Sequence, residues 1–167
     1  MIKSMYQERN IPKMLTSWIR LLVGLALLIG LSHAAQAGSG DIVVTDAWSR
    51  ASIGQSRPGA AYMVITNTGG GPVTLTAIKT DLAGKPEIHL SSTNDQGVSS
   101  MAPAGAITIA PGASVELKPG GLHAMLMMLT RPMVKGETFA LTLVFAGGRE
   151  VVVDVPILSL RARGPER

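Results

Sequence analysis

The 167-residue sequence contains no cysteine. Disulfide bonds are therefore excluded as a source of stability, although exported proteins often use them. Thiolate metal sites are excluded as well, and so is a lipid anchor attached to an N-terminal cysteine. Aromatic residues make up only 4% of the chain, and no basic stretch is interleaved with them. We therefore expect no nucleic-acid partner.

The first 37 residues have the three-part pattern of a secretory signal peptide. The basic residues of this segment are Lys3, Arg9, Lys13 and Arg20. The apolar segment Leu21 to Leu31 follows, and Ala35-Gln36-Ala37 supplies small residues for cleavage. The apolar segment is shorter than the roughly 20 residues that span a bilayer. We predict a signal peptide at 1–37, a mature chain from Gly38, a periplasmic location and no stable membrane insertion after cleavage. An uncleaved membrane anchor is the alternative, and Met5 or Met14 could be the true start.

Removing the signal peptide changes the charge balance. The full sequence has 15 Lys and Arg against 11 Asp and Glu, and four of these basic residues and one acidic residue precede Gly38. The mature chain keeps 11 basic and 10 acidic residues, a net charge of +1, so the high pI says little about partners. Its length suits a single domain. We place this domain at residues 38–160 and a short, frayed basic tail at 161–167.

Short stretches rich in β-branched residues alternate with glycine- and proline-rich turns along the mature chain. The predicted strands are Ile42–Ala51, Ala60–Asn67, Val73–Lys79, Pro86–Ser91, an edge strand around Ile107 and Ile109, Ser114–Leu117, the stretch after Pro119-Gly120-Gly121, Thr138–Phe145 and Glu150–Ile157. Residues 92–100 are polar and typical of a turn. No convincing amphipathic helix is present. This pattern predicts an all-β domain, either an antiparallel sandwich or a Greek-key barrel.

The strand after the Pro-Gly-Gly turn carries His123 and Met125. Side chains alternate along a strand, so these two point to one face, roughly 7 Å apart. The other histidine of the mature chain is His89, and Met101 follows it. Two imidazoles and two thioethers suit Cu(I) and are a poor set for zinc, calcium or magnesium. A blue-copper electron-transfer site needs a cysteine and is excluded.

The other methionines of the mature chain need no metal to explain them, because methionine is a common core residue. We expect Met63, Met128 and Met133 to fill the core. Met127 shares a face with His123 and is expected to pack beside the site, and whether it assists the site stays open. Taken alone, the His-x-Met pattern is a weak signal.

The spacing of all four candidate ligands resembles the motif of the periplasmic PCu(A)C copper chaperone family, His-(Met)-x10-Met-x21-His-x-Met. Here His89 and Leu90 are followed by ten residues, Met101, twenty-one residues and then His123-Ala124-Met125. The resemblance covers residues 41 to 157. Further matches are Trp48-Ser49-Arg50-Ala51, Ala60-Ala61-Tyr62 through Asn67, and Pro119-Gly120-Gly121.

This resemblance implies a single cupredoxin-like Greek-key β-barrel or sandwich that binds one Cu(I) near its surface. It also implies delivery of the ion to a copper enzyme, most often the CuA site of cytochrome c oxidase, alone or with a Sco-type protein. The implied metal ligands are His89, Met101, His123 and Met125.

The sequence departs from the family pattern in three places. Leu90 stands where a methionine often follows the first histidine, and Ala102-Pro103-Ala104 replaces a polar segment that often contains arginine. The His- and Met-rich C-terminal extension of some members is not seen, because the sequence ends with Arg161 to Arg167. A second copper site is therefore not expected.

Other functions remain as alternatives to delivery. A periplasmic copper buffer or resistance protein would use the same site without a dedicated acceptor. A metal-free β-sandwich interaction module would leave the ligand spacing unexplained. An enzyme is not expected, because the sequence offers no Ser-His-Asp set, no recognisable pair of carboxylates and no spare histidine for general base catalysis.

Overall fold

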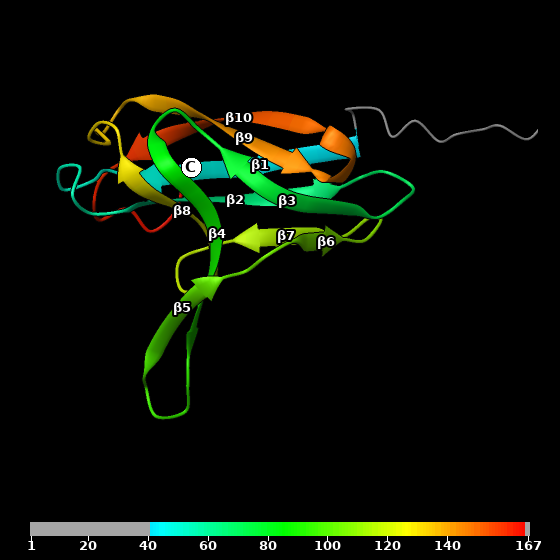
Figure 1. The fold of residues 1–167 in the computed structure, drawn as a ribbon, viewed down its shortest axis with the longest axis horizontal. Coiled ribbons are helices and arrows are strands. Elements are labelled where there is room, and N and C mark those ends of the chain that lie inside the picture. The colour runs from blue at the N-terminus through cyan, green and yellow to red at the C-terminus, as the bar shows by residue number, and fades with distance from the viewer. Residues whose placement is uncertain (1–40, 166–167) are drawn as a thin grey trace, which may run out of the picture. The chain divides into compact units, whose positions relative to one another are not determined.

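A computed structural model describes residues 41–165, and the predicted signal peptide lies outside the described residues. Ten strands run through the described part (Figure 1). They are β1 (Ile42–Arg50), β2 (Gly59–Asn67), β3 (Val73–Lys79), β4 (Ala83–Thr93), β5 (Ser99–Pro103), β6 (Ile107–Ile109), β7 (Ser114–Leu117), β8 (Leu122–Leu129), β9 (Thr138–Phe145) and β10 (Glu150–Leu158). A 3₁₀ turn, η2 (Ala146–Gly148), joins β9 to β10. Among residues 41–165 there is no helix with the length and apolar character needed to span a bilayer.

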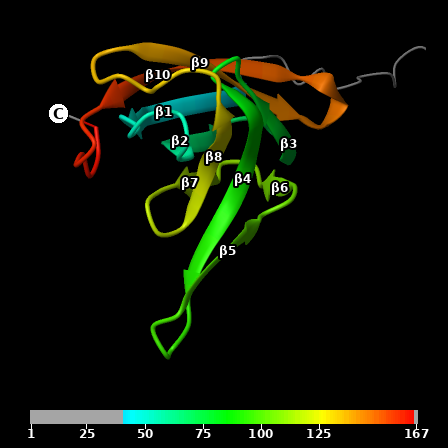
Figure 2. The same ribbon diagram turned by 60° about the vertical axis from the view of Figure 1, so that its left-hand side comes forward.

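The ten strands are paired in one continuous order, β5-β4-β8-β2-β1-β10-β9-β3-β6, with β7 also paired to β2. We call the part from β5 to β1 the first sheet and the part from β10 to β6 the second sheet. β1 and β10 are parallel, with Ser49 opposite Ile157, and the other strand pairs are antiparallel. The chain passes from one sheet to the other at several connections, including β2–β3 and β3–β4 (Figure 2). The all-β prediction is confirmed.

Alternate residues of both sheets point inward and form one hydrophobic core. On β9 the buried residues of this core are Phe139, Leu141, Leu143 and Phe145, and on β2 they are Ala61, Met63 and Ile65. Full burial of one such large side chain contributes roughly 1.5–3 kcal/mol. The remaining residues of the first sheet point outward, and this outer face carries the candidate site.

β7 and β8 both pair with β2, one after the other. Between them the chain leaves the ladder in a turn, in which the Lys118 amide donates to the Leu122 carbonyl (2.7 Å) and the Gly121 amide to the Lys118 carbonyl (3.1 Å). Gly120 has a φ of +81°, a left-handed conformation that glycine adopts without strain. The predicted Pro-Gly-Gly turn therefore interrupts one long strand just before His123.

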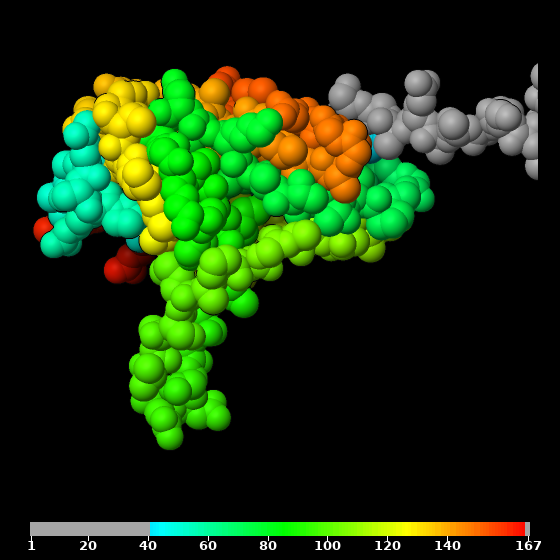
Figure 3. All heavy atoms as spheres, viewed as in Figure 1, coloured from blue at the N-terminus to red at the C-terminus, as the bar shows by residue number. Residues whose placement is uncertain are grey.

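Most predicted strands are confirmed, but the region around Met101 differs. β4 extends beyond the predicted Pro86–Ser91, and β5, which was not predicted as a strand, begins within the predicted turn at 92–100 and pairs with β4. The resulting β4–β5 hairpin projects from the body of the domain (Figure 3). All residues of β5 are exposed, so this strand lacks the alternation by which half-buried strands are recognised in a sequence.

The beginning of the C-terminal tail is attached to β1. The Nε of Arg50 donates to the Ala162 carbonyl (2.7 Å), and the Ala162 amide donates to the Ser159 carbonyl (3.0 Å). The guanidinium of Arg50 thus provides a partner for the backbone at Ala162. The division into a domain at 38–160 and a tail at 161–167 stays a prediction.

Candidate metal centre

The two predicted histidine ligands lie directly opposite each other on adjacent strands. His89 of β4 pairs with His123 of β8. Their ring centroids are 6.2 Å apart, with 50° between the ring planes. Both residues are largely buried, with exposed fractions of 9% and 5%. Opposed residues of antiparallel strands share a face, so the register of β4 and β8 alone brings the two imidazoles together.

Met125 lies two residues beyond His123 on β8, so its side chain points to the same face. Its cross-strand partners are Glu87 on β4 and Ala60 on β2. Ala60 has only a methyl group as its side chain, and with Met125 it lines a cavity on this face. Met125 is half-buried, which leaves its thioether partly accessible from that cavity.

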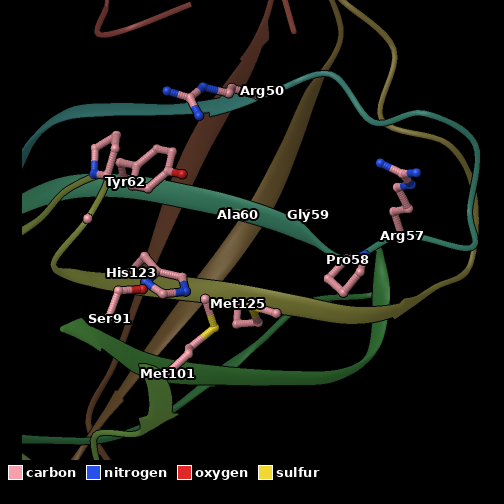
Figure 4. A pocket seen from close by; sticks show the side chains of 12 residues that line it. Arg50, Arg57, Pro58, Gly59, Ala60, Tyr62, Ser91, Met101, His123 and Met125 are labelled. Atoms are coloured by element: carbon pink, nitrogen blue, oxygen red, sulfur yellow. The ribbon is translucent and has the colours of Figure 1, made fainter. Parts of the chain in front are cut away.

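Met101 reaches the site from the projecting β4–β5 hairpin. It lies opposite Ser91, which is two residues beyond His89. Figure 4 shows the thioethers of Met101 and Met125 close to each other and to the His123 ring. Met101 is 51% exposed, so the site opens to solvent. The structure thus brings all four predicted ligands to one face of β5, β4 and β8, and their binding of a metal stays a prediction.

A hydrogen bond to the Pro-Gly-Gly turn fixes which nitrogen of His123 is free. The Nδ1 of His123 lies 3.0 Å from the Gly121 carbonyl oxygen. A carbonyl oxygen can only accept, so Nδ1 carries the proton and donates it. The lone pair of Nε2 is left for a metal. Metal-binding histidines are commonly held in one tautomer and one orientation in this way.

His89 is oriented by a carboxylate instead. Its Nε2 lies 3.1 Å from the carboxylate of Glu87 and donates to it. The Nδ1 atom is buried and has no hydrogen-bond partner within residues 41–165. Buried polar atoms are rarely left without a partner. A metal ion at Nδ1 would satisfy this atom, so the residues present fit the predicted metal.

Glu87 is a functional candidate that the sequence did not reveal. The hydrogen bond from His89 lowers the pKa of the Glu87 carboxyl group, with a further contribution from Lys85, and outweighs the opposing effect of desolvation. The Lys85 ammonium lies 3.4 Å from the same carboxylate. A carboxylate two residues before a candidate ligand on a strand is the signal that could have identified it, since both side chains share a face.

The donors that meet at this site are soft. Among the described residues, no three His, Cys, Asp or Glu side chains gather in a way that could hold a metal ion. A set that would suit zinc or a hard cation is therefore missing from this part of the chain. Two imidazole nitrogens and two thioether sulfurs suit Cu(I).

Comparison with known proteins places this chain in a family. A family model described as LpqE-like lipoproteins matches residues 42–157. The chain belongs to the LpqE-like family. A search among curated proteins finds no match to this chain.

Solved PCuAC structures resemble this LpqE-like chain in fold. The apo PCuAC domain from PmoF1 is 28% identical, with a TM-score of 0.61 over 72% of this chain and 95% of that domain. The copper-bound PCuAC domain from PmoF2 is 25% identical, with a TM-score of 0.60 over 72% of this chain and 94% of that domain. CuI-DR1885 from Deinococcus radiodurans is 33% identical, with a TM-score of 0.53 over 75% of this chain and 85% of that protein.

These matches confirm the resemblance to the PCu(A)C family and the cupredoxin-like fold. That family consists of metal-binding carriers, so the prediction that this protein is not an enzyme is also confirmed. The LpqE-like family description names lipoproteins, whereas this sequence has no cysteine that could carry a lipid.

The other methionines within residues 41–165 of this LpqE-like chain differ in burial. Met63 and Met133 are each 1% exposed and belong to the core, as predicted. Met128 is 72% exposed, so the prediction that it fills the core is wrong. Its φ of +57° interrupts the alternation of β8, and Leu129 rather than Met128 continues the buried face of Leu126. Met127 is partly buried and lies opposite Lys85.

An aromatic pair lies beside the candidate ligands of this LpqE-like chain. The ring centroids of Trp48 and Tyr62 are 4.6 Å apart. The guanidinium carbon of Arg50 lies 5.6 Å from the Trp48 ring centroid and 5.9 Å from that of Tyr62. Burial raises the pKa of the Tyr62 phenol, and the charge of Arg50 opposes this effect. The resemblance marked these segments, but the sequence did not indicate that they adjoin His123.

We expect Glu87→Ala to weaken Cu(I) binding by about tenfold, because losing the partner that orients a metal-binding histidine commonly costs 10–100-fold. Glu87→Gln keeps an oxygen that accepts from Nε2 of His89 and should bind within about threefold of the parent. Competition with a chromophoric Cu(I) chelator measures both affinities. Parent-like binding by Glu87→Ala, or equal losses in the two variants, would contradict the role assigned to this hydrogen bond.

Proposed function

We propose that the protein is a periplasmic copper chaperone that binds one Cu(I) through His89, Met101, His123 and Met125. The observation that carries this proposal is the convergence of two thioethers with two imidazoles that each have one free nitrogen lone pair. Further support comes from relatives solved with copper and with Cu(I). Cu(II) prefers a tetragonal set of nitrogen and oxygen donors, so it should bind more weakly than Cu(I).

The proposed role is delivery of copper to a copper enzyme, with the CuA site of cytochrome c oxidase as the acceptor, either alone or together with a Sco-type protein. The exposure of Met101 and the partial exposure of Met125 leave room for an incoming ligand. An acceptor can therefore gain one bond to the ion before the donor loses each of its own. Neutral ligands favour this exchange, because they add no charge that would hold the cation more tightly.

Copper transfer tests delivery against the alternative of a periplasmic buffer. The mature protein loaded with Cu(I) is mixed with the apo CuA domain of the oxidase subunit, the two proteins are separated, and the copper on each is measured. Delivery predicts that copper moves to the acceptor on mixing and stays on the donor when a dialysis membrane separates the proteins. Copper that stays on the donor in both arrangements would favour the buffer.

Release of the exported protein from the membrane depends on removal of the leader. We expect signal peptidase to cleave after Ala37 and to leave a product that begins at Gly38, because the leader ends in an Ala-x-Ala pattern. Intact-mass measurement of the exported protein checks that the leader has been removed, and N-terminal sequencing checks that the product begins at Gly38. A product that retains Leu21 to Leu31 would contradict it and would support the membrane-anchor alternative.

A further inference from the structure

A cavity of about 450 Å³ opens on the outer face of the first sheet, next to the candidate ligands. His123, Met125 and Met101 line one part of it, and Arg50, Arg57 and Tyr62 line another (Figure 4). No acidic side chain is among the residues that line this cavity. A site for a monovalent cation therefore adjoins a cavity whose charged side chains are two arginines.

Arg50 is held in place in this cavity. Its guanidinium lies over Trp48 and Tyr62, at 5.6 Å and 5.9 Å from the ring centroids, and such cation–π contacts orient an arginine. Its Nε donates to the Ala162 carbonyl at 2.7 Å. The two terminal nitrogens make no hydrogen bond within residues 41–165. A fixed guanidinium with a free fork of donors matches the geometry of a carboxylate.

Arg57 adds a second positive charge on the loop between β1 and β2. Neither Arg50 nor Arg57 forms an ion pair with a carboxylate among the described residues, whereas Lys79, Lys118 and Arg131 each do. Their charges are therefore not neutralised locally. Positive charge beside the site repels bound Cu(I) and attracts an anion that approaches it.

We propose that this cavity receives an anionic group of the copper-accepting protein, so that the acceptor docks with acidic side chains around its own copper ligands. The inference rests on the proposed function and adds the chemistry of the partner to it. The arginines would bring the acceptor to the metal and weaken the hold on the cation at the same place. Charge complementarity of this kind acts mainly on the rate of association and on the choice of partner.

Two synthetic dithiol peptides test the proposal. Both contain Cys-Gly-Gly-Cys, and they differ only in flanking residues, which are glutamates in one and glutamines in the other. Stopped-flow absorbance follows the anaerobic transfer of Cu(I) from the mature protein to each peptide. At low ionic strength the acidic peptide should take copper about tenfold faster than the neutral one, because electrostatic steering raises association rates by tenfold or more.

Three variants assign this preference to the cavity. Arg57→Gln should reduce the preference for the acidic peptide by about threefold, and Arg50→Gln should also reduce it. Lys79→Gln removes the same charge from the second sheet and should leave the preference unchanged. Cu(I) affinity should not fall in Arg57→Gln, because the lost charge repels the ion. In about 0.5 M salt, where screening is strong, the preference should disappear in every form.

Equal transfer rates to the two peptides from the parent would overturn the proposal, and so would an equal effect of Lys79→Gln and Arg57→Gln. In both cases Cu(I) would still be bound by the mature protein and would pass to a dithiol, so the proposed copper site would stand and only the acidic partner would fail. A mature protein that binds no Cu(I) would contradict the proposed function itself.

Discussion

Met125→Leu is expected to lower Cu(I) affinity by about a hundredfold or more, because the change removes one of two soft donors that select the cuprous ion. The apo-protein should melt at nearly the parent temperature. Methionine and leucine have similar volumes, and such swaps usually cost less than about 1.5 kcal/mol even in a core. Met125 is only half-buried, which makes the packing cost smaller still. Chelator competition measures the affinity, and differential scanning fluorimetry measures the melting temperature.

Met128→Leu is the matched control for this prediction. Met128 lies on the same strand, but its side chain is 72% exposed. Its left-handed backbone conformation interrupts the alternation that places His123 and Met125 on one face. The Met128→Leu variant should bind Cu(I) as tightly as the parent does. Copper should raise the melting temperature of Met128→Leu normally and that of Met125→Leu much less, because stabilisation by a ligand grows with the logarithm of its concentration over Kd. Equal behaviour of the two variants would remove Met125 from the ligand set.

Acidification is expected to produce an even larger loss of affinity. Protons compete with copper for both imidazole lone pairs, while thioethers do not titrate. Free histidine titrates near pH 6.5, so two competing histidines would lower the apparent affinity by roughly several hundredfold to a thousandfold between pH 7 and pH 5. Chelator competition at stepped pH values, with the chelator calibrated at each pH, gives the profile.

Glu87 should not cause this loss. The hydrogen bond from His89 lowers the pKa of Glu87, so its carboxylate is ionised at pH 7 and stays ionised at pH 5. Any contribution of that carboxylate is retained above its ordinary titration range and is lost only in stronger acid. The Glu87→Gln variant should therefore show the same steep profile as the parent. An affinity that stays flat from pH 7 to pH 5 would show that the histidines do not bind the metal.

The sequence was sufficient to predict the strands of the core and the four candidate ligands. Alternation of apolar and polar residues identified β3, the glycine-rich turn at 146–149 identified the hairpin of β9 and β10, and the spacing from His89 to Met125 identified the family resemblance. The pairing that unites these ligands was not readable. It depends on a register in which His89 faces His123 and on the hairpin that brings Met101 opposite Ser91. Strand partners separated by many residues leave no local pattern.

Three features near the site also had no signal strong enough to predict them. β5 is exposed at all five of its residues, so no alternation of buried and exposed positions distinguishes it from a turn. The exposure of Met128 follows from one left-handed backbone residue on β8. The cluster of Arg50 with Trp48 and Tyr62 forms only because β1 and β2 pair in the register that sets Trp48 opposite Tyr62. All three depend on tertiary pairing rather than on residue type.

Copper K-edge X-ray absorption of the mature protein, loaded with Cu(I) under anaerobic conditions and freed of excess metal, is the most direct test of the proposed site. The proposal predicts one copper per chain in the cuprous state, with a nearest shell made of two nitrogen and two sulfur atoms. The chain contains no cysteine, so any sulfur in that shell must come from methionine. A nearest shell of nitrogen and oxygen without sulfur would contradict the assignment of Met101 and Met125 as ligands.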